Sequence, residues 1–256
     1  MTTGQLVVDL NADLGESFGA WRLGDDEALL SIVTSANIAC GFHAGDPLTI
    51  RRACAGAVAR RVSIGAQVSY RDLAGFGRRE MDVPPDELAA EVLYQIAALD
   101  GIARAEGGKV SYVKPHGALY GRSARDPVQA GAIAAAIAAY DRSFPLLTLP
   151  GSEAAAAAQA AGLTVIAEAF ADRAYNDDGT LVPRGRSGAV LTDAAAVAAR
   201  AVTMVTGRKV ESAAGREIRI SPRSVCIHGD TAGAVALARS VRTALEQAGV
   251  RVAPFA

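Results

Sequence analysis

The sequence predicts a single-domain α/β barrel that spans residues 1–256. Three observations lead to this prediction. Short apolar runs alternate with longer helical segments along the whole chain, which is typical of parallel βαβ units. Half of the residues are hydrophobic, enough for a large core. No glycine-rich nucleotide motif follows the first strand, so closure into a barrel is favoured over an open sheet.

Seven short runs rich in apolar and β-branched residues are the expected strands, and seven longer segments with helical periodicity are the expected helices. The strands are expected at 6–13, 36–40, 64–69, 110–114, 146–149, 164–169 and 225–228. The helices are expected near 25–34, 47–61, 85–106, 127–140, 152–161, 192–206 and 231–248.

Capping residues support these boundaries. Asp46-Pro47 combines a helix N-cap with proline at the first helical position, and Gly162 is placed to end the helix before it. The segment 207–223 breaks the alternation, because two short runs of alternating residues flank Ala214-Gly215. It predicts a small β-hairpin inserted before the last strand.

Composition restricts the partners. The net charge of −1 and a pI near 6.3 give no electrostatic reason to expect nucleic acid or an anionic membrane. No apolar run is long enough to span a membrane, since the alanine-rich stretch 154–161 ends at a glycine. We therefore expect a small-molecule substrate, or a protein partner.

The compartment is predicted from the cysteines and the first residues. Cys40, Cys54 and Cys226 show no CxxC spacing, so neither a disulfide framework nor a structural zinc site is expected. Residues 1–5 have no basic segment of the kind that opens a secretory signal. These features predict a cytoplasmic protein.

All three histidines, His43, His116 and His228, end or directly follow an expected strand. One histidine in such a place is more often structural. Because the carboxyl ends of barrel strands meet at one face, three of them favour a shared functional site. Histidine is both a common metal ligand and the usual acid or base at neutral pH.

Acidic and amide side chains accompany the histidines. Asp9, Asn11 and Asp13 alternate along the first strand, so in a barrel covered by helices they must point inward. Glu16 follows in the first loop, and Asp13 is expected to touch substrate or metal. Asp230 has two open interpretations: it orients an imidazole, or it caps the last helix at the residue that follows it.

Cationic residues occupy the same expected loops. Lys114 ends the fourth strand, and burying its charge without a task is costly. Arg78 and Arg79 close a glycine-rich loop after the third strand, and Arg173 follows the sixth. Paired arginines suit carboxylate or phosphate recognition, although for Arg79 simple surface solvation is equally open. Cys40 is expected to be a buried structural thiol.

Six ordered motifs closely resemble those of the LamB/YcsF family, from about residue 6 to the C-terminus. They lie at 9–16, 35–47, 75–79, 112–120, 168–173 and 228–231. The resemblance implies a (β/α)7-like distorted barrel related to sugar deacetylases. One position departs from the family, because Gln67-Val68 replaces a His-Pro pair found in many members. No role of that histidine is carried over.

The family contains the A subunits of bacterial ATP-dependent 5-oxoprolinase. Membership implies opening of 5-oxo-L-proline to L-glutamate, coupled to ATP hydrolysis, in complex with subunits B and C. From the motifs we expect catalytic roles for Asp13, His43, Lys114, His116 and His228. We expect substrate-binding roles for Asn11, Glu16, Arg78, Arg79, Arg173 and Asp230.

The chemistry is consistent with this family. A lactam is a stable amide, and phosphorylation of its oxygen creates a better electrophile. No Walker-type loop is present, so ATP is expected at a composite interface or on a partner. Two alternatives remain: a metal-dependent amide or N-acetyl hydrolase with Asp13, His43 and His116 as divalent-metal ligands, and a non-catalytic binding subunit of a hydrolase complex. The many ionisable groups argue against the second.

Overall fold

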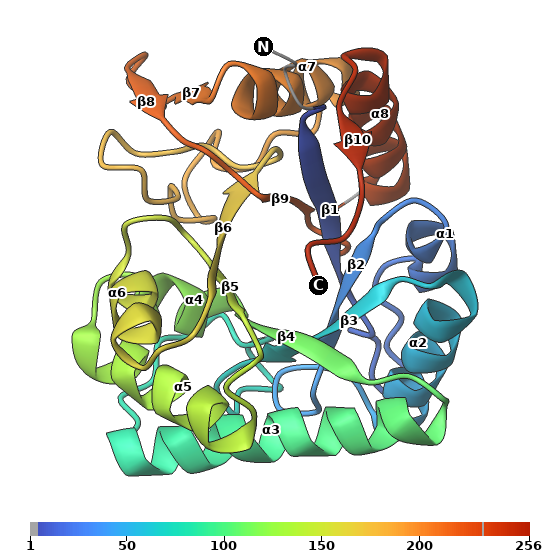
Figure 1. The fold of residues 1–256 in the computed structure, drawn as a ribbon, viewed down its shortest axis with the longest axis vertical. Helices are drawn as coiled ribbons and strands as arrows, with labels where there is room; N and C mark the ends of the chain where they lie inside the picture. The colour runs from blue at the N-terminus through green and yellow to red at the C-terminus, as the bar shows by residue number, and fades with distance from the viewer. Residues whose placement is uncertain (1–4, 232) are drawn as a thin grey trace.

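The computed structural model describes residues 5–231 and 233–256, and its centre is a closed barrel of parallel strands (Figure 1). The first strand pairs with both the second and the last barrel strand, which closes the ring. The predicted barrel is confirmed. Its strands, in order around the ring, are β1 (Val7–Leu14), β2 (Ser35–Ala39), β3 (Ser63–Val68), β4 (Val110–Pro115), β5 (Leu146–Thr148), β6 (Val165–Phe170) and β9 (Ser224–Ile227).

The helices surround the barrel (Figure 1). Asp46 caps its helix as predicted, because its Oδ1 accepts hydrogen bonds from the backbone N–H groups of Leu48 and Thr49. Gly162 follows the end of α6 with φ +77°, a conformation that glycine adopts without strain. The helices are α1 (Asp26–Leu30), α2 (Pro47–Arg60), α3 (Pro85–Ala105), α4 (Gly117–Ser123), α5 (Pro127–Tyr140), α6 (Glu153–Ala160), α7 (Ala194–Thr206) and α8 (Ala234–Gln247).

Two short elements were not predicted. Helix α4 begins directly after His116, and its first and fifth residues are glycines, which weaken helical propensity. The two-residue strand β10 (Arg251–Val252) pairs with the start of β1. Both depend on tertiary contacts, such as the hydrogen bond from the Ala118 amide to the carbonyl of Gly77.

Strand β1 divides its side chains between two environments, as its alternation predicted. Its even positions, including Leu10 and Leu14, belong to the main apolar core. Its odd positions face the barrel interior, where Asn11 donates from Nδ2 to Ser224 and Glu168 on other strands. The barrel interior is therefore polar, and the apolar core lies between the sheet and its helices.

The C-terminal segment crosses the amino-terminal end of the barrel. The Phe255 ring packs edge-on against Tyr112, with centroids 4.9 Å apart, beside buried Leu147 and Ile166. The Ser63 hydroxyl donates to the backbone oxygen of Ala256. Apolar packing thus fills this end, and the carboxyl end of the strands is left for a site.

The predicted hairpin is present as β7 (Lys209–Glu211) paired antiparallel with β8 (Glu217–Arg219). Val210 and Ile218 belong to a second apolar cluster with residues of the long segment between β6 and α7. The Ser212 hydroxyl donates to Asp177 in that segment over 2.6 Å. The hairpin therefore supports a segment that reaches the barrel mouth.

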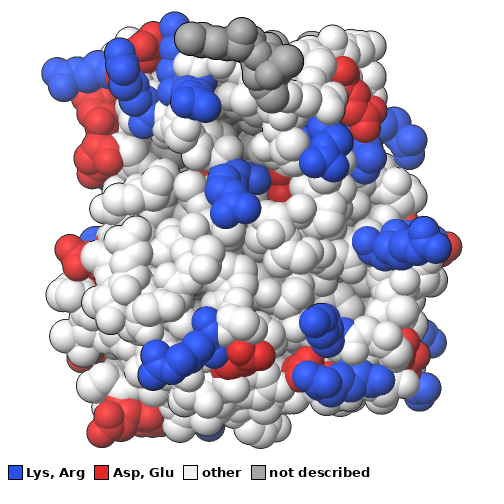
Figure 2. Space-filling model, viewed as in Figure 1, with Lys and Arg blue, Asp and Glu red and all other residues white. Residues whose placement is uncertain are grey.

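Charge is dispersed on the face shown in Figure 2, where lysines and arginines alternate with acidic residues around a largely uncharged centre. Among the residues that the structure describes, no helix has the length and apolar character needed to cross a bilayer.

Candidate active site

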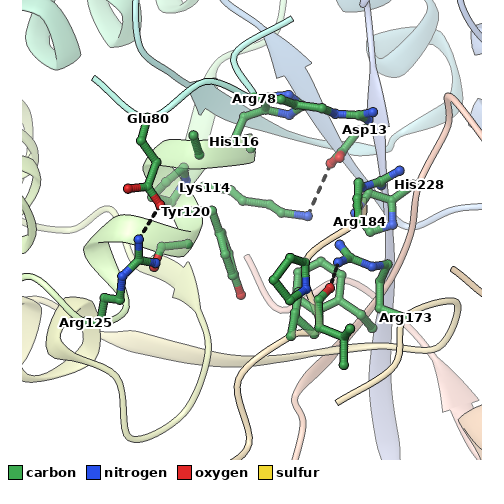
Figure 3. A pocket seen from close by; sticks show the side chains of 18 residues that line it. Asp13, Arg78, Glu80, Lys114, His116, Tyr120, Arg125, Arg173, Arg184 and His228 are labelled. Carbon is green, nitrogen blue, oxygen red and sulfur yellow. Dashed lines mark hydrogen bonds and ion pairs between the residues drawn. The ribbon is translucent and has the colours of Figure 1, made fainter. Parts of the chain in front are cut away.

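A cavity of about 290 Å³ opens at the carboxyl ends of the strands, and we call it the mouth pocket (Figure 3). Its walls come from loops that are far apart in the sequence. One side is apolar, with Phe170, Leu181, Val182 and Pro183. The charged and polar side chains that line it are Asp13, Arg78, Glu80, Lys114, His116, Tyr120, Arg125, Arg173, Arg184 and His228.

Lys114 lies at the base of the mouth pocket and is only 2% exposed. Its Nζ is 2.8 Å from Oε1 of Glu168 and 3.2 Å from Oδ1 of Asp13. Burial alone would lower its pKa, but these carboxylates outweigh burial and raise the pKa of Lys114 well above the usual value. The pocket base therefore carries a fixed ammonium.

Asp13 is the partner of Lys114 that faces the pocket. Burial favours its neutral form, but its surroundings, above all the Lys114 ammonium, lower the pKa of Asp13 below its ordinary value. The Asn37 amide also donates to its Oδ1 over 2.9 Å. Asp13 is consequently ionised at neutral pH.

Asn11 lies beneath Lys114 and does not line the mouth pocket. Its Oδ1 accepts from Lys114 over 3.2 Å and from Asn37 over 2.7 Å. The structure thus makes Asn11 a positioning residue for Lys114, whereas the family motif led us to expect a substrate contact.

His228 lines the opposite part of the base and is held by Asp172. Its Nδ1 lies 2.9 Å and 3.0 Å from the two carboxylate oxygens, and its ring stacks on Phe170. Because Nδ1–H donates to Asp172, Nε2 remains as an acceptor. Histidine held in this way by a carboxylate is a typical general acid and base.

Two interpretations of Asp230, that it orients an imidazole and that it caps the last helix, were wrong. Asp172 orients His228, and Gly233 occupies the N-cap of α8. Asp230 instead forms ion pairs with Arg78 and with Arg184. Asp230 was expected because it lies two residues after His228 in the sequence. Asp172 follows a different strand, β6, so its proximity to His228 is not visible in the sequence.

A second polar group lies beside the mouth pocket, and we call it the Gln67 cluster: Glu16, His43, Gln67 and His116. The imidazoles of His43 and His116 stack with centroids 4.0 Å apart. Gln67 Oε1 lies 3.2 Å from His43 Nε2, while Gln67 Nε2 lies 3.0 Å from His116 Nδ1 and 3.1 Å from Glu16 Oε1. One amide therefore contacts all three other members.

Hydrogen bonding in the cluster is consistent when His43 donates from Nε2 and His116 accepts at Nδ1. His116 then donates from Nε2 to the carbonyl of Phe76 over 3.1 Å. Burial lowers the pKa of His43 to about 4, and burial with the nearby His43 lowers the pKa of His116 well below its usual value. Burial and Asp13 raise the pKa of Glu16. Both imidazoles are neutral at neutral pH.

The grouping of potential metal ligands differs from the predicted set. Ligand atoms of Glu16, His43 and His116 lie within 4.8 Å of one another, and Asp13 groups separately with Cys226 and His228. Asp13 was the wrong carboxylate for the two histidines. Its inward direction followed from alternation along the strand, but its neighbours depend on how the loops fold over the barrel end.

The three predicted arginines do not all reach the mouth pocket. Arg78 and Arg173 line the mouth pocket, but Arg79 does not. The Arg79 side chain is 68% exposed, and its Nε donates to Asp72 over 2.9 Å. The structure thus places Arg79 outside the mouth pocket, where it braces its own loop, and matches the surface interpretation better than the substrate contact.

Several residues that line the mouth pocket were not predicted from the sequence. Arg184 lies in the long loop between β6 and α7, and Arg125 follows the short helix α4, so neither residue is at a strand end. Tyr120 lines the pocket from α4, which was itself not predicted. The sequence distinguished Gln67 only because it differs from the histidine that many family members have at this position.

Comparisons with known proteins agree with these motifs. The LamB/YcsF family profile matches residues 8–256. A protein from Streptomyces avermitilis, named as the A subunit of 5-oxoprolinase, is 62% identical over 98% of this chain and 100% of its own. One of the same name from Mycolicibacterium gilvum is 56% identical over 97% of this chain and 98% of its own.

The crystal structure of a lactam utilization protein from Thermus thermophilus has the same fold. It superposes with a TM-score of 0.92 at 48% identity, covering 98% of this chain and 100% of that one. With the family profile matched over almost the whole chain, this protein belongs to the LamB/YcsF family.

Proposed function

We propose that this chain is the A subunit of a cytoplasmic 5-oxoprolinase, which opens the lactam ring of 5-oxo-L-proline to give L-glutamate with hydrolysis of ATP. The observation that carries the proposal is the convergence of Asp13, Lys114 and His228 on one pocket, in a chain 62% identical to a protein named as the A subunit of 5-oxoprolinase. Such a pocket combines a fixed charge with an acid–base group, as amide hydrolysis requires.

The mouth pocket suits a small anionic ring. Phe170, Leu181 and Val182 offer apolar contacts to the ring carbons. Arg173 lies on the same pocket and is 6% exposed, and among the described residues its side chain donates only to two backbone carbonyls, which leaves further N–H donors for a ligand. A guanidinium in this place is suited to the substrate carboxylate.

His228 and Lys114 supply the chemistry at the pocket base. His228 accepts a proton at Nε2 from the attacking water and returns it to the ring nitrogen as the C–N bond breaks, while Asp172 stabilises the imidazolium. The Lys114 ammonium polarises the lactam oxygen and stabilises the negative charge of the phosphoryl group that this oxygen receives. Ionised Asp13 keeps this ammonium in place.

ATP activates the lactam in this proposal. The γ-phosphoryl group passes to the lactam oxygen and ADP leaves. Water then adds to the ring carbon, the C–N bond breaks with proton transfer to nitrogen, and a second water cleaves the acyl phosphate to glutamate and phosphate. Since the sequence has no Walker-type loop, we propose that subunits B and C complete the ATP site. The relatives are each named as one subunit of an enzyme, which supports a complex.

The test is glutamate production from 5-oxoproline with ATP, by the chain alone and with subunits B and C. We expect activity only with the partners. Full coupled activity by the chain alone would show that the partner assignment is wrong. If no combination forms glutamate, the proposed reaction is wrong.

The Gln67 cluster favours a second candidate, a metal-dependent amide hydrolase. Two imidazoles and a carboxylate are suitable donors for a divalent cation, which would activate water when bound. Yet the Gln67 amide contacts all three donors, so a cation must displace it or use its oxygen. Activity lost on chelation and restored by divalent metal, without ATP, would favour this candidate.

A further inference from the structure

Two arginines from different loops meet at one carboxylate beside the mouth pocket. Arg78, after β3, pairs with Oδ2 of Asp230, and Nη2 of Arg184 lies 3.7 Å from Oδ1 of the same acid. Arg184 comes from the segment between β6 and α7. Figure 3 shows both arginines with Arg173 on the His228 side of the pocket, away from Arg125.

The three guanidinium groups are close enough to repel one another. Burial, together with the charges of Arg184 and Arg78, lowers the pKa of Arg173 to about 10. The hydrogen bonds of Arg173 go to the carbonyls of Val182 and Ala189, not to an acid. Keeping such charges together costs free energy unless an anion is present.

Among the described residues, Asp230 is the only acid that forms an ion pair with any of these three arginines. Asp172 is close to the group, but its two oxygens bind the ring and backbone N–H groups of His228. Asp230 is shared by two arginines. In addition, Nη2 of Arg184 is buried and has no hydrogen-bond partner among residues 5–231 and 233–256.

The substrate carboxylate accounts for only part of this charge. It supplies one negative charge, and Arg173 is sufficient to bind it. Arg78 and Arg184 then remain as two planar donors that face the pocket and share one acid. Paired guanidinium groups of this kind suit the several oxygens and the higher charge of a phosphate group.

We propose that Arg78 and Arg184 form a phosphoryl-binding subsite of the mouth pocket. The subsite rests on the proposed function for its source of phosphate, which is either the nucleotide itself or a lactam phosphorylated on oxygen. Asp230 occupies the two arginines when no phosphate is bound, and competes with it. Arg78, Arg184 and Asp230 therefore act as an anion switch beside Lys114.

The experiment is calorimetric titration of the full chain with inorganic phosphate at constant ionic strength, and separately with ATP and with ADP. We expect saturable binding of one phosphate per chain. Arg78→Gln and Arg184→Gln should each weaken it at least about tenfold, or about 1.4 kcal/mol. Asp230→Asn should tighten it, because a competing anion is removed; a purely structural role for Asp230 predicts the opposite.

Arg51→Gln is the matched control, since Arg51 pairs with Glu106 on the outer helices and should leave binding unchanged. Circular dichroism and melting temperature verify folding, and Arg184→Lys serves if Arg184→Gln does not fold. ATP that binds more tightly than phosphate and competes with it identifies the nucleotide as the source. Phosphate binding that ATP does not displace, even in the complex with subunits B and C, identifies the phosphorylated lactam.

Two results overturn the subsite: no saturable binding of phosphate or ATP, or binding equal to wild type in both Arg78→Gln and Arg184→Gln. These results are separable from failure of the proposed function. Glutamate formation without phosphate binding overturns only the subsite. Phosphate binding without glutamate formation in any subunit combination overturns only the proposed reaction.

Discussion

The Nδ1 atom of His228 lies 2.9 Å from Oδ2 of Asp172, an acid 56 residues earlier in the chain. The two residues follow β9 and β6, which are neighbours in the barrel. Although burial favours the neutral acid, the contacts with His228 lower the pKa of Asp172. The pair therefore fixes both the tautomer of His228 and the direction of its ring at the base of the mouth pocket.

Replacing this acid tests the pair. Asp172→Asn should lower kcat by about a hundredfold or more with little change in KM, because the substrate contacts remain while the imidazolium loses its partner. Steady-state kinetics of the complete complex measure this. Asp82→Asn is the control, since Asp82 is exposed, pairs with Arg122 and does not line the mouth pocket. Equal losses of kcat in both variants would contradict the assignment of Asp172.

The histidines test the site as a whole. His228→Ala should reduce turnover by at least about a hundredfold, the usual scale for an acid–base group, and His43→Ala and His116→Ala should also reduce it because the Gln67 cluster borders the mouth pocket. Circular dichroism should show a retained fold. Near-wild-type turnover in two of the three variants would contradict a shared site.

Lys114 should contribute to both activity and stability. Lys114→Ala should strongly lower kcat and should lower the free energy of unfolding by about 3–5 kcal/mol, because Asp13 and Glu168 are left as buried charges without a partner. Denaturant titration measures the second effect. The double variant Lys114→Met, Glu168→Gln leaves only Asp13 without its partner, so it should recover part of the stability but not turnover. Recovery of both would show that Lys114 is only structural.

Arg173 and Arg79 form a matched pair of predictions. Arg173→Lys should raise KM for 5-oxoproline more than it lowers kcat, because a carboxylate contact is present in ground and transition states alike. Arg79→Lys should leave KM unchanged, since Arg79 lies outside the mouth pocket and binds Asp72. A raised KM in the Arg79 variant alone would reverse this assignment.

Asp9 should make stability depend on pH. Burial outweighs its hydrogen bonds from Ser224, Ser35 and Thr34 and raises the pKa of Asp9 from 3.8 to about 6. The folded state therefore binds this proton more tightly than the unfolded state. The resulting stabilisation is complete below pH about 3.8 and is lost as pH rises through about 6.

The matched variant is Asp9→Asn, which has no proton to lose. From pH 4 to pH 7, the unfolding free energy of the wild type should fall relative to the variant by about 2 kcal/mol, most of the effect of this pKa shift at about 1.4 kcal/mol per pKa unit. Urea titrations across this range provide the measurement. A constant difference between the two proteins would show that Asp9 does not titrate there.

The architecture was largely predictable because its signals are local. Alternating apolar runs located all seven barrel strands, and Asp46 and Gly162 marked helix ends through hydrogen bonds and conformations within a few residues. Alternation along β1 also predicted that Asp9, Asn11 and Asp13 point inward. Short elements with weak propensity, α4 and β10, were missed because contacts distant in the chain stabilise them.

The sequence by itself determined the barrel, the family and the end of the barrel that holds the histidines, because strand order and strand ends follow from local patterns. Only the tertiary structure decided the partners: Asp172 for His228, Glu16 and Gln67 for His43 and His116, and Asp72 for Arg79. Most of these contacts join residues from different loops, and the contact between Arg79 and Asp72 depends on how a single loop folds. Their distances depend on packing, which spacing along the chain does not encode.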